Sequence, residues 1–209
     1  MILKQSKIVA SDECFNLMGK MMANSPLLLA VAFIQQLDPL AGLVSASAFW
    51  STVVAALPEL EKLGSVILVA GAGPYEALRQ QVADTDTFRL YAFIDAMPDL
   101  LGAADVVVAR AGATTIQELA AIEKPTILVP NAALTGGHQL KNAAVYGDAQ
   151  VALVLDEDVM VERPKLLVDA VRFYLKDTKT TQSMARRFGT YAKPNAAKDV
   201  AELILSAAK

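Results

Sequence analysis

The sequence predicts an α/β domain built on a doubly wound parallel sheet. Short apolar runs recur along the chain, and segments with helical periodicity lie between them. Runs that are apolar without alternation are typical of strands covered on both faces, which is how parallel sheets are built. Because strand and helix alternate along most of the chain, we expect a sheet with helices on both of its faces.

Six apolar runs are the expected strands, namely Leu27–Ile34, Val66–Ala70, Arg89–Phe93, Asp105–Ala109, Thr126–Pro130 and Val151–Leu155. Helices are expected where apolar residues recur at intervals of three and four. These segments are Tyr75–Val82, Thr115–Ile122, Gln139–Tyr146, Glu162–Tyr174, Thr181–Phe188 and the amphipathic C-terminal stretch Ala196–Ala208. Residues 1–25 are a poorly assigned N-terminal segment, so we expect one domain over residues 26–209.

The charge-free stretch from Pro39 to Pro58 allows two interpretations. Of the chain's residues, 54% are hydrophobic, so a membrane-seated helix has to be weighed. A spanning helix needs about 20 strongly apolar residues, and small polar residues such as Ser45 and Ser47 dilute this stretch. A buried strand and helix in this region is therefore the favoured interpretation, with the membrane-seated helix as the alternative.

Composition excludes several classes of function. The net charge of −3 argues against a nucleic-acid-binding protein, which normally carries a basic stripe that contacts the phosphates. A single cysteine and a single histidine, His138, cannot form a Cys/His metal cluster, and no nucleophile motif lies beside that histidine. Neither a Walker motif nor a Gly-x-Gly-x-x-Gly turn occurs. We expect no nucleic-acid partner, no cofactor, no metal, and a cytoplasmic location because a signal for export is lacking.

Three loops that follow expected strands are candidate ligand sites. In an open parallel sheet, ligands bind beyond the carboxyl ends of the strands, near helix N-termini whose free N–H groups favour anions. The first loop reads Gly71-Ala-Gly-Pro74. Its glycines allow a tight turn or a positive φ, and Pro74 suits a first helical turn. Strand-to-helix turn chemistry is therefore favoured over phosphate binding at this loop.

The second loop, Arg110-Ala-Gly-Ala-Thr-Thr-Ile-Gln-Glu118, offers the most to a ligand. Gly112 lets the backbone approach closely, and Thr114 or Thr115 can cap the helix while offering hydroxyl and N–H donors to a phosphate. Glu118 has two interpretations of equal weight. It closes a capping box with Thr115, or its carboxylate accepts both hydroxyls of a ribose.

The third loop begins at Asn131 and contains His138 and Gln139 behind the pair Gly136-Gly137. A lone histidine at a helix start is usually structural or solvated. Amide and imidazole groups at such a position also suit a ligand rich in hydroxyl groups. The residues themselves leave a binding role and a structural role equally open.

Four segments in this order resemble the C-terminal half of MurG-like glycosyltransferases of family 28: Phe93–Met97, Ala104–Leu119, Lys124–Pro130 and His138–Ala143. Members of that family add N-acetylglucosamine from its UDP donor to a lipid-linked acceptor. The resemblance implies a Rossmann-like fold, equivalent to the donor-binding C-terminal half of a GT-B glycosyltransferase. It also implies a hexosyltransferase that uses UDP-GlcNAc or a related UDP-sugar, is incomplete as a single chain, and is cytoplasmic or peripheral at the inner face of the membrane.

The candidate donor-binding residues are Ile94, Arg110, Gly112, Ala113, Thr114, Thr115, Glu118, His138 and Gln139. Carried over by position, the resemblance implies that Ile94 contacts uracil and that Glu118 binds the ribose diol. Residues 113–115 would meet the diphosphate, and His138 and Gln139 would contact the sugar. The chemistry implied is inverting displacement at the anomeric carbon, with helix dipole and backbone N–H groups in place of a metal.

Two departures from the family pattern leave three hypotheses open. Family members carry a glycine- and serine-rich loop after the first strand of this half, where this chain has Ile34–Pro39. We also expect the acceptor-binding half, which carries the family's general base, to be missing from this chain. In the first hypothesis, the chain is a donor-binding subunit that works with a separate membrane-associated acceptor-binding protein. In the second, it is a fragment or remnant of a MurG-like enzyme. In the third, it is a non-catalytic domain that binds a nucleotide sugar or serves as a scaffold.

Overall fold

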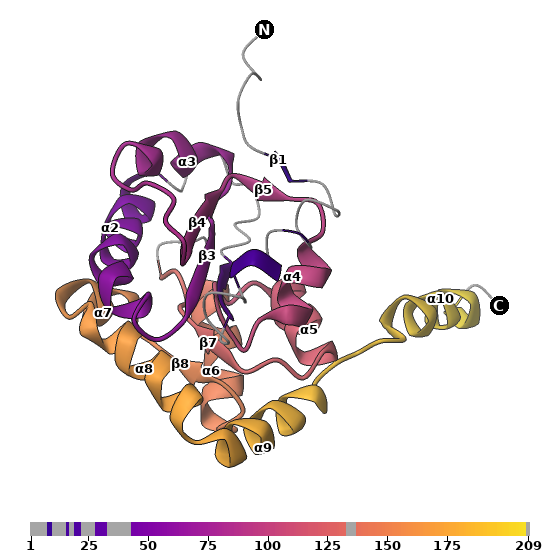
Figure 1. Cartoon of the computed structure of the whole chain (residues 1–209). Coiled ribbons are helices and arrows are strands. Elements are labelled where there is room, and N and C mark those ends of the chain that lie inside the picture. The colour runs from indigo at the N-terminus through magenta and orange to yellow at the C-terminus, as the bar shows by residue number, and fades with distance from the viewer. Residues whose placement is uncertain are drawn as a thin grey trace, which may run out of the picture.

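The computed structural model describes residues 8–9, 16, 19–21, 28–32, 43–132 and 137–207. Its centre is a parallel six-stranded sheet (Figure 1). The strand order is β4-β3-β2-β6-β7-β8. The strands are β2 (Leu28–Ala32), β3 (Ser65–Val69), β4 (Phe88–Tyr91), β6 (Val106–Ala109), β7 (Thr126–Leu128) and β8 (Leu153–Val154). Each of them lies within, or overlaps, one of the six expected apolar runs, so the predicted parallel sheet is confirmed.

Helices cover both faces of this sheet, as the doubly wound prediction requires (Figure 1). One face is covered by α2 (Leu43–Leu60), α3 (Ala72–Arg79), α7 (Glu157–Glu162) and α8 (Lys165–Lys176). The other is covered by α4 (Met97–Ala103), α5 (Ala113–Ala121) and α6 (His138–Asp148). The helix α9 (Thr178–Gly189) contributes buried side chains to both layers.

Alternate residues of each central strand pack into opposite layers. In β6, Val106 and Val108 face the α2 and α8 layer, whereas Val107 and Ala109 face the α4 and α5 layer. All four are buried, and fully burying one such valine contributes about 1.5–3 kcal/mol. This two-sided burial is the physical reason for the continuous apolar runs in the sequence.

The charge-free stretch before Pro58 forms the greater part of α2, and one face of this helix is packed in the domain core. Phe49 and Val53 are buried there, and the ring of Phe49 meets that of Trp50 edge to face with centroids 5.1 Å apart. The favoured interpretation, a buried element, therefore holds for this helix. Within the described residues, none of the helices has the length and apolarity needed to cross a membrane.

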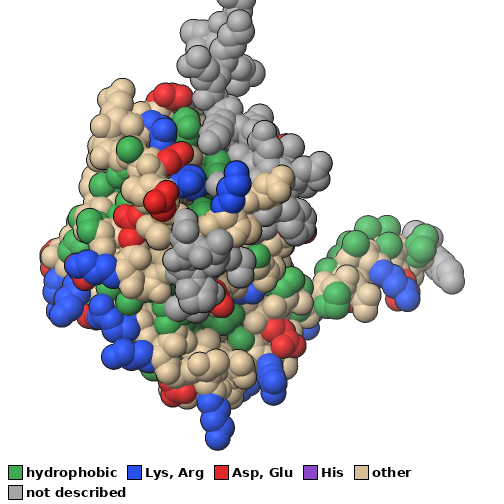
Figure 2. All heavy atoms as spheres, viewed as in Figure 1, with side chains coloured by type: hydrophobic (Ala, Val, Ile, Leu, Met, Phe, Trp, Pro, Cys, Tyr) green, Lys and Arg blue, Asp and Glu red, His purple; other side chains and the backbone are tan. Residues whose placement is uncertain are grey.

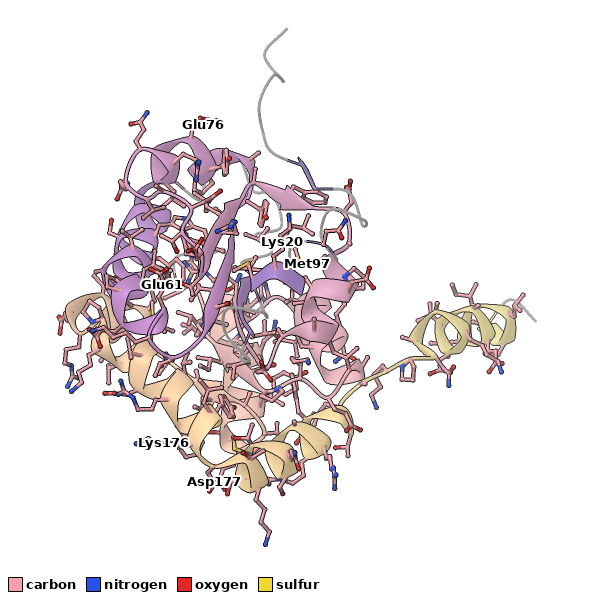
Figure 3. The ribbon with its side chains drawn as sticks, viewed as in Figure 1. Lys20, Glu61, Glu76, Met97, Lys176 and Asp177 are labelled. Carbon is pink, nitrogen blue, oxygen red and sulfur yellow. The ribbon has the colours of Figure 1, made fainter. Side chains whose placement is uncertain are left out.

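In the helical region after β8, the first expected helix is broken near its start. A single helix was expected from Glu162 to Tyr174, but Glu162 ends α7 and a new helix, α8, begins at Lys165. Pro164 explains the break, because proline lacks an N–H and disfavours helical geometry at the residue before it. Asp177 lies between α8 and α9 (Figure 3). It caps the start of α9, because its carboxylate accepts a hydrogen bond from the Thr180 N–H.

Described parts of the N-terminal segment contact the domain. The short strand β1 (Ile8–Val9) pairs parallel to β5 (Phe93–Ile94), and Met21 is buried in the α4 and α5 layer. The boundary placed between residues 25 and 26 stays a prediction.

The last helix, α10 (Ala196–Ala207), lies apart from the body of the domain (Figure 1). None of its described side chains is buried, and Leu203 is 67% exposed. Hydrophobic side chains gather along it in Figure 2. The expected terminal helix is thus confirmed as far as Ala207, and its apolar side chains are open to solvent.

Candidate functional site

The order of the strands selects one place along the carboxyl edge of the sheet. Counted from β2, the order is 3-2-1-4-5-6, so the chain winds outward in both directions from the boundary between β2 and β6. Ligands of open α/β sheets bind in the crevice at such a switch point, outside the carboxyl ends of the strands. The loop after β2, Ile34–Pro39, lies outside the described residues. The loop after β6 is Arg110–Gly112, which opens α5.

Among the described residues, no side chain caps the N-terminus of α5. Gly112 is the N-cap residue, with φ −72° and ψ 137°, and the first helical hydrogen bond runs from the Ile116 N–H to the Gly112 carbonyl at 3.0 Å. The expected cap at Thr114 or Thr115 and the capping box between Thr115 and Glu118 are therefore wrong, because the helix begins before either threonine. No hydrogen bond from its first N–H groups to a described residue is present, so these groups can donate to water or to a ligand.

The first turns of α5 separate a buried face from an exposed one. Thr115 is only 6% exposed and packs inward, so its side chain is part of the domain's packing. Thr114 and Glu118 are exposed and stand four residues apart, which places them one above the other on the same face. Among the residues that the structure describes, Glu118 forms no ion pair.

Arg110 is held by the domain itself. Its guanidinium forms a bidentate pair with Glu157, with N–O distances of 2.6 and 2.9 Å, and also donates to the Val129 carbonyl at 3.2 Å. The ring of Phe49 in α2 lies 4.3 Å from the guanidinium carbon. Strand alternation continues from Val108, so the side chain points to the α2 and α7 layer. A direct contact between Arg110 and a donor stays a prediction.

The third loop leads into α6, which begins beside α5 because β6 and β7 are neighbours. Residues 133–136, which include Gly136, lie outside the described residues. Gly137 is the N-cap in the left-handed conformation at φ 64°, and His138 is exposed in the first turn. The Gln139 side-chain carbonyl accepts a hydrogen bond from the Asn131 N–H at 2.9 Å. Gln139 therefore links the end of β7 to α6, and its contact with a sugar stays a prediction.

The segment Phe93-Ile-Asp lies farther along the same edge, directly after β4. Ile94 is 1% exposed, so its side chain and its backbone are both covered, and the implied contact with uracil stays a prediction. The neighbouring Phe93 is 54% exposed. Because β4 and β6 are three strand spacings apart, the carboxyl ends of these two strands lie about 14 Å apart along the edge.

The first candidate loop, Gly71–Pro74, forms the strand-to-helix turn that the sequence predicts. Gly71 has φ +80° and is the N-cap of α3, while Pro74 stands in the first turn of that helix. The conformation requires a residue without a Cβ, since other residues are strained at this φ. The glycine at this position is thus explained by the turn itself.

Sequence reasoning missed three residues that shape the site. Asn142 in α6 donates through Nδ2 to the Ala111 carbonyl at 3.0 Å, and Glu157 holds Arg110. Phe93 is the exposed neighbour of the buried Ile94. A signal existed for Asn142, which belongs to the segment His138–Ala143, and for Phe93, which belongs to Phe93–Met97. The partner of Arg110 stands 47 residues away and had no local signal.

Comparison with known proteins gives a consistent result. The family model described as the glycosyltransferase family 28 C-terminal domain matches residues 40–204. The UDP-N-acetylglucosamine--N-acetylmuramyl-(pentapeptide) pyrophosphoryl-undecaprenol N-acetylglucosamine transferase of Natranaerobius thermophilus is 32% identical over 163 residues, 74% of this chain and 44% of the relative. The protein of the same name from Exiguobacterium sp. is 33% identical over 160 residues, with 76% and 43% covered. The chain thus spans less than half the length of these curated relatives.

Solved structures share the fold. MurG of Acinetobacter baumannii superposes with a TM-score of 0.69 at 24% identity, covering 88% of this chain and 53% of that one. The complex of S. aureus MnaA with UDP gives a TM-score of 0.66 at 12% identity, covering 94% and 49%. These likenesses establish the architecture as that of the Rossmann-like half of a GT-B glycosyltransferase. Because the family model matches most of its residues, the chain belongs to the glycosyltransferase family 28 C-terminal domain family.

Proposed function

We propose that this domain binds UDP-GlcNAc or a related UDP-sugar at the carboxyl edge of its sheet and presents the sugar for inverting transfer to a lipid-linked acceptor. The observation that carries the proposal is the uncapped start of α5 at the switch point of the strand order. An uncapped helix N-terminus offers free N–H groups and the positive end of the helix dipole to an anion. A diphosphate is the part of a UDP-sugar that fits there.

Gly112 supports a close approach of the diphosphate. A Cβ built on this residue would meet only the Thr115 hydroxyl, at an ordinary 3.9 Å, and its φ of −72° is open to any residue. Neither backbone conformation nor packing therefore requires glycine at this position. A ligand that lies against the backbone does require it. The N–H groups of residues 113–115 would then complete the phosphate site.

Glu118 is suited to the ribose. Its carboxylate lies on the same exposed face as Thr114, one turn farther along α5, so a ligand whose diphosphate lies at the N-terminus would extend past it. A carboxylate can accept hydrogen bonds from both hydroxyls of a ribose diol. Its other interpretation, a capping box, is excluded by the position at which α5 begins.

The base and the sugar of the donor would lie on opposite sides of the N-terminus of α5. Toward β4, the base would lie beside Ile94, where the exposed ring of Phe93 is available for stacking. Toward β7, the sugar would reach the exposed His138 and the amide of Gln139 at the start of α6. The separation of about 14 Å between the β4 and β6 ends suits an extended nucleotide along the edge.

Donor binding in this domain can be tested by titration calorimetry with UDP and UDP-GlcNAc, first in EDTA and then with Mg²⁺. We expect binding in both buffers. The Glu118→Ala substitution should weaken it by about 1–3 kcal/mol, the scale of lost charge-assisted hydrogen bonds. Gly112→Ala should weaken it at least tenfold while the domain stays folded. The matched control is Glu162→Ala, which removes an exposed carboxylate from the end of α7. A folded wild type that gives no heat with either ligand contradicts the proposal.

Transfer requires a second component in this proposal. The relatives named as transferases are more than twice as long as the matched region, and a general base must come within hydrogen-bond reach of the acceptor hydroxyl. We therefore expect the domain alone to bind donor without transferring sugar. Transfer should appear when an acceptor-binding domain or membrane-associated partner is added. Turnover by the isolated domain, measured as release of UDP with a lipid-linked acceptor, would contradict this part.

A further inference from the structure

Two amide side chains of α6 tie it to the ends of both neighbouring strands. Gln139 and Asn142 are three residues apart and therefore share one face of the helix. The Gln139 side-chain carbonyl accepts from the Asn131 N–H after β7, and the Asn142 Nδ2 donates to the Ala111 carbonyl after β6 at 3.0 Å. The loop that opens α5 is thus fastened to the helix beside it.

The Asn142 contact fixes the orientation of one particular peptide group. The Ala111 carbonyl and the Gly112 N–H belong to the same planar unit, and in a trans peptide they point in opposite directions. Because Asn142 holds the carbonyl on its own side, the N–H of Gly112 is directed away from Asn142. Gly112 is the N-cap of α5, so this N–H is among those at the uncapped helix start.

Gly112 makes such a restraint necessary. A glycine has access to many backbone conformations, and the peptide on its N-terminal side can rotate at little steric cost. On the other side of Ala111, the residue Arg110 is already anchored by its pair with Glu157. The anchoring of Arg110 consequently does not fix the orientation of the Ala111–Gly112 peptide. The Asn142 side chain fixes it through the hydrogen bond to the Ala111 carbonyl.

We propose that Asn142 is a positioning residue for donor binding, which acts by aiming the Gly112 N–H at the diphosphate. This inference rests on the proposed function and adds to it a residue that touches no part of the ligand. Without the restraint, the peptide would sample orientations in which a carbonyl faces the phosphate. Binding would then have to select the productive orientation, which lowers the apparent affinity by the fraction of molecules in that orientation.

The test compares two substitutions that each remove a side-chain donor from a backbone carbonyl. Asn142→Leu removes the bond to Ala111, and the control Thr181→Val removes the bond from the Thr181 hydroxyl to the Tyr174 carbonyl, 2.8 Å long and remote from the edge. Both should lower the Tm. Only Asn142→Leu should weaken UDP binding in calorimetry, by at least fivefold. An affinity of Asn142→Leu within twofold of wild type, or an equal loss in Thr181→Val, overturns the inference.

A second measurement uses the wild type and covers the case in which Asn142→Leu does not fold. In ¹⁵N-labelled protein, the amide resonance of Gly112 should move downfield when UDP is added, because its N–H then donates to a phosphate. A Gly112 resonance that UDP leaves in place overturns the inference even if UDP binds. A wild type that does not bind UDP at all contradicts the proposed function, and the role of Asn142 falls with it.

Discussion

The buried pair between Arg110 and Glu157 permits a quantitative prediction about stability. Both side chains are about nine-tenths buried, at 9% and 10% exposure, and the two N–O distances of 2.6 and 2.9 Å form a bidentate pair. In Glu157→Ala, the arginine keeps the Val129 carbonyl and the ring of Phe49 but loses the bidentate pair with Glu157. Breaking a buried ion pair by removing one partner costs about 3–5 kcal/mol of unfolding free energy.

The magnitude can be measured by urea unfolding followed by circular dichroism. For a chain of this length, 3–5 kcal/mol corresponds to a Tm lower by roughly 6–20 °C. The double variant Arg110→Met/Glu157→Leu should recover most of the loss, because apolar residues of similar volume often replace a buried ion pair at little cost. A Glu157→Ala variant within about 1 kcal/mol of wild type would refute the reasoning, as would a double variant that is less stable than Glu157→Ala.

Two further predictions concern pH. Burial raises the pKa of Tyr174 to about 12, above its unfolded value near 10. The neutral phenol therefore contributes its full stabilisation below about pH 10. This contribution is lost as the pH rises toward 12. Tyr174→Phe should abolish that alkaline loss in urea titrations and cost about 1–3 kcal/mol at neutral pH, because the Leu153 N–H and the Thr126 carbonyl lose their partner. The Thr180 N–H lowers the pKa of the Asp177 carboxyl, so this cap contributes above about pH 4 and is lost as the pH falls through the lowered pKa. Asp177→Asn keeps a cap that does not titrate, and its stability should fall less than that of wild type between about pH 5 and about pH 2.

The strands could be predicted because burial on both faces of the sheet favours an apolar residue at every position of the strand. In β6, successive valines face opposite layers, so no polar position interrupts the run. The order of the strands could not be obtained in the same way, since pairing of β2 with β6 joins residues almost 80 positions apart and depends on the whole chain. The break before α8 was open to prediction, because Pro164 marks it in the sequence.

The candidate site was only partly open to prediction. Glycine and threonine residues follow β6 in the sequence, and either type can be the N-cap of α5. The structure shows that Gly112 is the N-cap. Strand alternation from Val108 indicates that Arg110 lies on the α2 side of the sheet. Its partner Glu157 is brought there by the tertiary fold alone. Propensity and spacing therefore locate the loop, whereas the direction of each side chain depends on contacts between distant segments.

The position of Glu118 makes the proposed site testable with little interference from folding. Its carboxylate is exposed, belongs to no cap, and forms no ion pair with the described residues. Exposed substitutions of this kind usually change stability by no more than about 0.5 kcal/mol. Thr115 and Arg110 do not share this property, because both are buried and their removal disturbs the domain. A loss of UDP affinity in Glu118→Ala would consequently report on the ligand, while the same loss at Arg110 would report on the fold as well.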